Sequence, residues 1–118
     1  MRIVFMGSPD FAIPSLQKLQ QSDHEIVSVV SNIDKRRGRG GGTSPTAVKK
    51  KALELDLSVI EVEDLNDSSF HDELAALNAD LFVVVAFRIL PTSVLNLPSK
   101  GSINLHASLL PKYRGAAP

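Results

Sequence analysis

The sequence contains no cysteine, which excludes a disulfide framework, a thiolate metal site and a cysteine nucleophile. It also lacks any apolar run near the roughly 20 residues needed to cross a bilayer. The N-terminal stretch MRIVFMGSPDF has one basic residue, and its apolar part reaches Gly7 too soon for a secretory signal. We therefore expect a cytoplasmic protein with no membrane partner.

The composition fits one globular domain with a small core. Of the 118 residues, 43% are hydrophobic and 22% are charged, which argues against disorder. The net charge of zero conceals an asymmetry, because residues 35–51 hold seven bases and no acid, whereas residues 52–80 hold nine acids and no base. The basic segment indicates a polyanionic partner, and the alternative is a solvated surface loop followed by an acidic helix face.

Short apolar runs predict five strands. They cover residues 2–6, 25–31, 57–62, 81–87 and 102–107. Helical spacing of apolar residues separates them, with start signals at Ser8-Pro9-Asp10, Ser44-Pro45, Asp67-Ser68 and, for a short turn, Pro91. The pattern predicts an α/β fold with a Rossmann-like, doubly wound, mostly parallel sheet, and the very hydrophobic run 81–87 is expected at its centre.

Ligands of such sheets bind beyond the carboxyl ends of the strands. Four chemically notable segments fall at those ends: residues 7–10, 31–43, 87–90 and 104–114. We expect them to lie at one edge of the sheet.

The first of these segments lacks the second and third glycines of a dinucleotide fingerprint. Its residues Gly7, Ser8, Pro9 and Asp10 form either a tight strand-to-helix turn or a turn whose N–H groups face a polar substrate.

The glycine-rich run 38–42 is not a phosphate-binding P-loop, because no Gly-Lys-Ser/Thr ends it. With Arg37 and Arg39 beside it, this run favours contact with nucleic acid.

Asn104 and His106 lie two apart on a predicted strand, so their side chains share a face. An amide and an imidazole together suit acyl-type transfer, because both can stabilise an oxyanion and the imidazole can also move protons. No second histidine or carboxylate has the spacing of a metal ligand, so we expect no metal.

Four stretches closely resemble the N-terminal part of the methionyl-tRNA formyltransferase family: FMGSPDFAIPSL, GRGGGTSPTAVK, VVVAF with LP after it, and NLHASLLPKYRGAAP. The resemblance implies a formyltransferase fold and formyl transfer from 10-formyltetrahydrofolate to the amine of initiator methionyl-tRNA in a monomeric parent enzyme. It also implies that residues 1–118 form the N-terminal part of the catalytic domain. The rest of that domain and a C-terminal β-barrel are then absent, and the chain is a truncated piece.

The resemblance assigns roles to individual residues. Asn104 and His106 match the catalytic Asn-x-His, while the family's downstream Asp has no counterpart in the chain. The implied folate-binding residues are Phe87, Arg88, Ile89, Leu90, Ser108, Leu109, Leu110 and Pro111. The implied tRNA-binding residues are Lys35, Arg36, Arg37, Arg39 and Gly40, and Gly7–Asp10 form a loop on the substrate side.

Two departures from the family pattern keep alternatives open. Gly41-Gly42 stand where Lys-Lys is frequent, and residues 87–90, FRIL, replace a commoner tyrosine-glycine form and resemble the purine enzyme. The alternatives are a sugar-nucleotide or purine formyltransferase and a ligand-binding module without chemistry. In each case we expect residues 1–118 alone to be inactive and to self-associate through the exposed strand near their end.

Overall fold

The computed structural model describes residues 1–36 and 43–105. Its elements in chain order are β1 (Arg2–Met6), η1 (Asp10–Ala12), α1 (Ile13–Gln20), β2 (Glu25–Asn32), β3 (Lys35–Arg36), β4 (Thr43–Ser44), α2 (Ala47–Glu54), β5 (Val59–Val62), α3 (Ser68–Ala76), β6 (Leu81–Val85), α4 (Thr92–Leu95) and β7 (Ser102–Leu105). In this part of the chain, no helix is long and apolar enough to cross a membrane.

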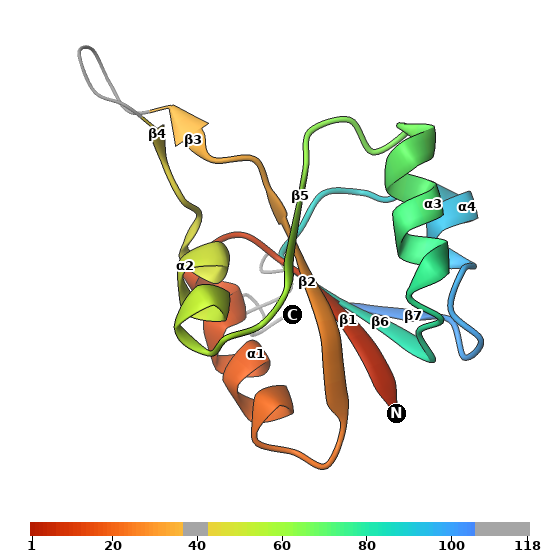
Figure 1. Ribbon diagram of the computed structural model, residues 1–118, viewed down its shortest axis with the longest axis horizontal. Coiled ribbons are helices and arrows are strands. Elements are labelled where there is room, and N and C mark those ends of the chain that lie inside the picture. Colours follow the sequence, from red (N-terminus) through yellow and green to blue (C-terminus); the bar gives the residue numbers. More distant parts are fainter. Residues whose placement is uncertain (37–42, 106–118) are drawn as a thin grey trace, which may run out of the picture.

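Five strands form a sheet in the order β5-β2-β1-β6-β7, and every neighbouring pair is parallel (Figure 1). The predicted doubly wound α/β fold is thereby confirmed. The expectation that the run 81–87 is the central strand is wrong, because β1 holds the middle position and β6 lies beside it. Both strands have neighbours on each side and buried residues on each face, so hydrophobicity does not distinguish them.

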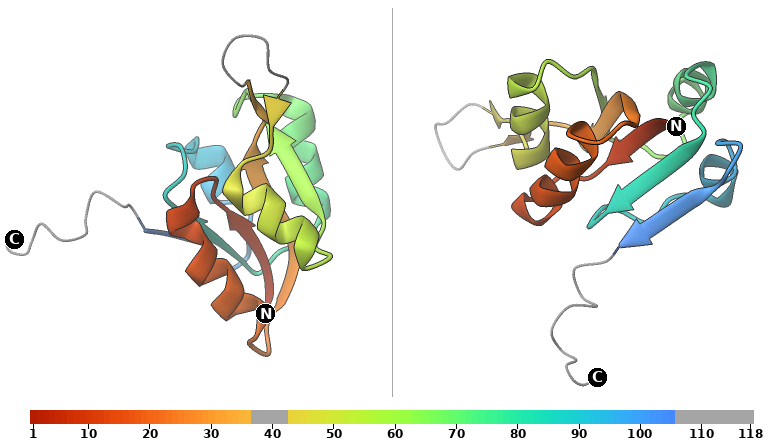
Figure 2. Two further views of the ribbon diagram at one scale, coloured as in Figure 1. Left: turned by 90° about the vertical axis from the view of Figure 1, so that its left-hand side faces the viewer. Right: turned by 90° about the horizontal axis from the view of Figure 1, so that it is seen from below.

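Helices cover both faces of the sheet (Figure 2). Leu16 of α1 and Val48 and Ala52 of α2 pack with one set of strand residues. On the opposite face, Phe70 and Leu74 of α3 and Val94 of α4 pack with the alternate set. The chain winds outward from β1 through β2 to β5 and then returns to β6 on the other side of β1. The carboxyl ends of β1 and β6 therefore flank the topological switch point, where doubly wound folds hold their ligands.

Helix starts were predicted with mixed success. Asp67 caps α3 as expected, since its side chain accepts a hydrogen bond from the Ser69 N–H. The cap assigned to Ser44 is wrong, because Thr46 caps α2 by accepting from the Lys49 N–H. The cap assigned to Ser8 is wrong too: a 3₁₀ turn precedes α1, and neither helix start has a side-chain cap.

A short antiparallel hairpin, which the sequence did not predict, begins within the notable segment 31–43. Lys35 of β3 pairs with Ser44, and Arg36 pairs with Thr43 of β4. Figures 1 and 2 show this β3–β4 hairpin projecting beyond the carboxyl edge of the sheet, away from the helices. Two-residue strands are too short to show a side-chain periodicity, so β3 and β4 could not be predicted from apolar spacing.

Arg2 holds the opposite end of the sheet together, where β1 and β6 begin. Its backbone N–H donates to an Asp80 carboxylate oxygen at 2.8 Å, and its guanidinium donates to the Leu77 carbonyl at 2.7 Å, at the end of α3. The hydrogen bond from the Arg2 backbone is the main reason why the pKa of Asp80 lies below its usual range. These contacts fix the amino ends of β1 and β6.

Candidate active site at the carboxyl edge

The turn after β1 is packed directly against its neighbouring strands. The Gly7 N–H donates to the Val30 carbonyl of β2 at 3.0 Å. A Cβ on Gly7 would lie 2.9 Å from the Val85 carbonyl oxygen of β6 and 2.9 Å from Ala12 Cβ. Glycine is therefore required here by close approach, because a side chain would push β1 and β6 apart at the switch point.

Replacing Gly7 with alanine is expected to destabilise the fold by about 1–3 kcal/mol, the usual cost of overpacking a filled site. The contact with the Val85 carbonyl is to main chain, so it cannot be relieved by a side-chain rotation. Urea unfolding of the wild type and of Gly7→Ala measures the difference. Equal stabilities would show that the turn yields easily and that Gly7 does not set the spacing of the strands.

A row of hydroxyl groups ties this turn to β2 and α2. The Ser8 hydroxyl accepts from the Asn32 N–H at 3.1 Å and lies 3.5 Å from the hydroxyl of Ser31. The buried Ser31 hydroxyl is in turn hydrogen-bonded to Thr46 at the start of α2. Asn32 Oδ1 is buried without a hydrogen-bond partner among the described residues. Polar groups with unused bonding capacity thus stand at the edge predicted to take a ligand.

The chain turns sharply after β6. Ala86 has a left-handed backbone with φ of 48°, which is uncommon for alanine, and its N–H donates to the Leu105 carbonyl at 2.7 Å. The two other non-glycine residues with positive φ in residues 1–36 and 43–105, Asp56 and Asn78, directly follow helix C-caps and are residue types that tolerate it. Backbone strain of this kind is often found at functional sites, and Ala86 lies at the candidate site.

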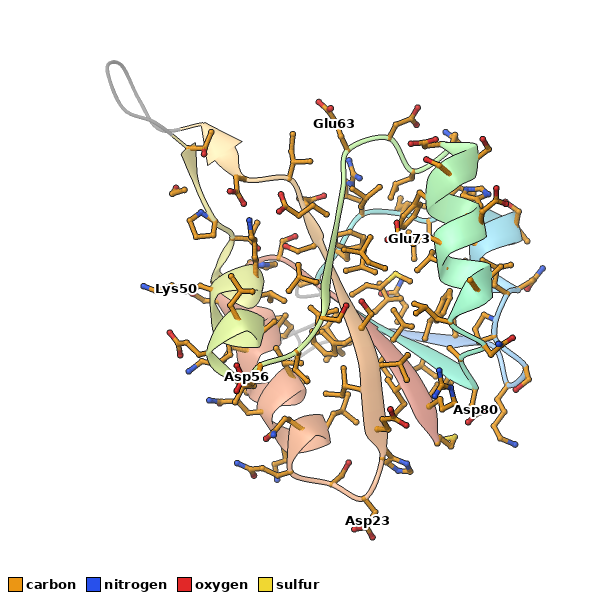
Figure 3. All side chains as sticks on the ribbon, in the orientation of Figure 1. Asp23, Lys50, Asp56, Glu63, Glu73 and Asp80 are labelled. Atoms are coloured by element: carbon orange, nitrogen blue, oxygen red, sulfur yellow. The ribbon has the colours of Figure 1, made fainter. Side chains whose placement is uncertain are left out.

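The residues of segment 87–90 differ in their exposure to solvent. Ile89 is 86% exposed, whereas Leu90 is buried against the core with Phe87 packed at its border. The Arg88 guanidinium donates to the Glu63 carbonyl at 2.7 Å and to the Val62 carbonyl at 3.4 Å, so the side chain reaches the end of β5. Figure 3 shows Glu63 at that carboxyl end and Asp80 toward the opposite edge.

Asn104 lies on β7, paired in register with Val84 of β6. Because paired residues of parallel strands point to the same side, Asn104 faces the side of the sheet covered by α3 and α4. Phe87 and Leu90 pack on the same side of the sheet, so the first catalytic candidate and part of the folate candidate share that side. His106, Ser108, Leu109, Leu110 and Pro111 lie outside the described residues.

The basic candidates are only partly described. Lys35 and Arg36 form β3, while Arg37, Arg39 and Gly40 lie outside the described residues. Within the described ranges, no group of three histidine, cysteine, aspartate or glutamate side chains is arranged to hold a metal ion.

Sequence reasoning missed one ionic cluster beside the hairpin. Lys49 Nζ lies 2.8 Å from Asp34 Oδ1 and 2.7 Å from Glu61 Oε2. Both hydrogen bonds raise the pKa of Lys49, and the bond to Asp34 has the larger effect. On the same helix, the hydrogen bond from the Lys51 ammonium lowers the pKa of Glu54. The sequence showed Lys49 only as part of a basic run, and no signal in it pairs the residue with acids 15 and 12 positions away.

The fold and this edge define a class: a doubly wound α/β domain whose candidate ligand site lies at the carboxyl ends of β1, β6 and β7. Within that class, the family model for formyl transferase matches residues 1–118, and the chain belongs to that family.

Curated relatives agree with the family match. The chain is 52% identical over 119 residues to the methionyl-tRNA formyltransferase of Parabacteroides distasonis and 52% identical over 119 residues to that of Moorella thermoacetica. It is 53% identical over 121 residues to that of Chlorobium limicola. Each alignment covers 100% of this chain but only 37% or 38% of the relative. The chain thus spans little more than a third of the length of these proteins.

Proposed function

We propose that a full-length protein carrying this chain transfers the formyl group of 10-formyltetrahydrofolate to the α-amine of initiator methionyl-tRNA, in the cytoplasm. Residues 1–118 then form the N-terminal part of its catalytic domain. The observation that carries the proposal is the identity of about half of all residues, over the whole chain, to proteins named for this activity. The position of Asn104 near the carboxyl end of β7, on the side of the sheet where Phe87 and Leu90 pack, supports it.

The reaction needs groups that stabilise a developing oxyanion. The α-amine attacks the formyl carbon, a new C–N bond forms, and the carbonyl oxygen becomes negatively charged. The Asn104 amide and a protonated His106 donate hydrogen bonds to that oxygen. The bond between the formyl carbon and the folate nitrogen then breaks, and the proton lost by the amine passes to that nitrogen. An Asp farther along the parent sets the charge state of His106 and assists this proton transfer.

In this proposal, different segments of the chain contact the two substrates. Residues 87–90 and 108–111 form the folate wall, with exposed Ile89 available to a ligand and buried Leu90 holding the segment in place. The turn Gly7–Asp10 lies on the side of the acceptor, where backbone N–H groups can face polar atoms. The basic segment with Lys35, Arg36, Arg37, Arg39 and Gly40 meets the tRNA acceptor end.

An acceptor panel tests the function. The full-length protein is given 10-formyltetrahydrofolate with methionyl-tRNA, with an amino-sugar nucleotide or with the amine of a purine-precursor ribonucleotide. Formylation of methionyl-tRNA well ahead of both others is expected. Preference for the purine precursor would favour the alternative that the FRIL segment raises, and binding of nucleotides without any turnover would indicate a module that performs no chemistry.

Arg39→Ala in the full-length protein is expected to raise the KM for methionyl-tRNA by about tenfold or more, because a hydrogen bond to a charged group contributes about 1.5–3 kcal/mol. The dependence of binding on salt should fall by about one phosphate contact. Folate affinity should not change. Lys18→Ala on α1 removes the same charge away from the hairpin and serves as the control. Equal loss of folate and tRNA binding would indicate misfolding and contradict the assignment.

A further inference from the structure

One lysine joins three separate elements at the root of the β3–β4 hairpin. Lys49 extends from α2, Asp34 directly precedes β3, and Glu61 lies on β5. The Lys49 side chain is only 17% exposed, so both of its ion pairs are partly shielded from water. Figure 3 shows its neighbour Lys50 pointing outward from the same helix.

Both flanks of the hairpin are anchored near this lysine. Asp34 precedes the first residue of β3, and Lys49 holds it. Thr46 follows β4 by two residues, accepts from the Lys49 N–H and is hydrogen-bonded to the buried Ser31 of β2. The chain therefore enters and leaves the hairpin through two fixed points that meet at the first turn of α2.

The charges argue that this cluster does not itself bind an anion. One lysine faces two carboxylates, so the net charge of the cluster is negative, and both acids occupy the ammonium group. A phosphate placed here would have to displace one of them and would meet their repulsion. The contribution of Lys49 to a polyanionic partner is then indirect, through the hairpin that it anchors.

We propose that Lys49, held between Asp34 and Glu61, is a positioning residue that fixes the direction of the basic β3–β4 hairpin for binding the tRNA substrate. This inference rests on the proposed function, since that function supplies the tRNA. An unanchored hairpin samples several directions, and the apparent affinity for a partner falls by the fraction of time spent in the competent one.

The experiment uses the full-length protein with Lys49→Met, which keeps an unbranched side chain one heavy atom shorter and removes the charge. We expect the KM for methionyl-tRNA to rise by about tenfold if the hairpin is competent a tenth of the time, with kcat and folate KM unchanged. Amide hydrogen exchange at residues 35–36 and 43–46 should become faster. Lys49→Arg, which can meet both acids, should restore both measurements.

Lys51→Met is the matched control, because Lys51 pairs at 2.9 Å only with Glu54 of its own helix among the described residues. It should leave tRNA KM and hairpin exchange unchanged. Equal effects of the two variants would overturn the proposal, as would unchanged exchange in Lys49→Met or a parallel loss of kcat and folate affinity.

The two proposals fail in different ways. If the wild type does not formylate methionyl-tRNA, the proposed function fails. Hydrogen exchange and fluorescence anisotropy with a labelled, uncharged tRNA still test the anchoring role of Lys49. Weaker tRNA binding by Lys49→Met than by Lys51→Met, together with faster hairpin exchange, would support the positioning role; equal binding would refute it.

Discussion

Replacing His106 with alanine in the full-length protein is expected to lower kcat by about 10²–10³, the usual loss when one donor to a developing oxyanion is removed. The folate KM should change little, because the hydrogen bond strengthens only as the formyl oxygen gains charge. Single-turnover formylation of methionyl-tRNA measures the effect on the chemical step. Turnover within a few fold of the wild type would show that His106 does not have this role.

Two further variants make that result specific. Asn104→Ala should lower kcat by a similar factor, because its amide is the second proposed donor to the oxyanion. His24→Ala removes a histidine whose Nδ1 lies 3.0 Å from the N-terminal amine, at the opposite edge of the sheet, and should leave kcat unchanged. A loss of stability common to all three variants would instead point to the fold.

The sheet could be predicted from the sequence because its strands are short, continuous apolar runs. Strands buried on both faces need such runs, and in β1 the four residues from Ile3 to Met6 are all buried. The ends of strands were less predictable, since they depend on backbone events. Strand β6 stops at Val85 because Ala86 turns left-handed, and β5 begins at Val59 because the Leu57 N–H is bonded to Ala52 at the end of α2.

The sequence predicted the location of the candidate site better than the hydrogen bonds that its side chains make. Gly7 approaches both Val30 and Val85, and Ala86 is bonded to Leu105, so the ends of four strands do meet at one edge. Polar side chains there were harder to assign, because a serine can bond along the chain or across it. The Ser8 hydroxyl bonds across to β2 rather than capping its own helix, and only the folded structure distinguishes these choices.

The pattern of charges along the chain did not predict ion pairs between residues that lie far apart in the sequence. Lys49 belongs to a basic run and Glu61 to an acidic one, and these runs were interpreted as two separate surfaces. The fold places α2 against β5, so the two residues pair across the boundary. Local composition therefore indicated a basic arm and could not show how that arm is anchored.

A polypeptide limited to residues 1–118 is expected to show no formyl transfer. The sequence after His106 contains no aspartate or glutamate, so no carboxylate there can tune the histidine or take a proton from the amine. Strand β7 pairs with β6 on one side and with no other described strand, and the side chains of Ile103 and Leu105 are 56% and 41% exposed. Asn104, the proposed catalytic asparagine, thus stands on the edge strand of the described sheet, where a reacting group is poorly held.

The same exposed edge should make this polypeptide self-associate, because an open strand with apolar side chains can pair with another chain. Intact mass spectrometry first verifies that the sample consists of 118 residues. Sedimentation velocity should then show dimers or larger species whose proportion grows with concentration, and Ile103→Lys should shift the sample toward the monomer by placing charge on the edge. In the formylation assay the verified sample should give no product from methionyl-tRNA. Measurable turnover would show that Asn104 and His106 suffice without a downstream carboxylate and without further strands beside β7.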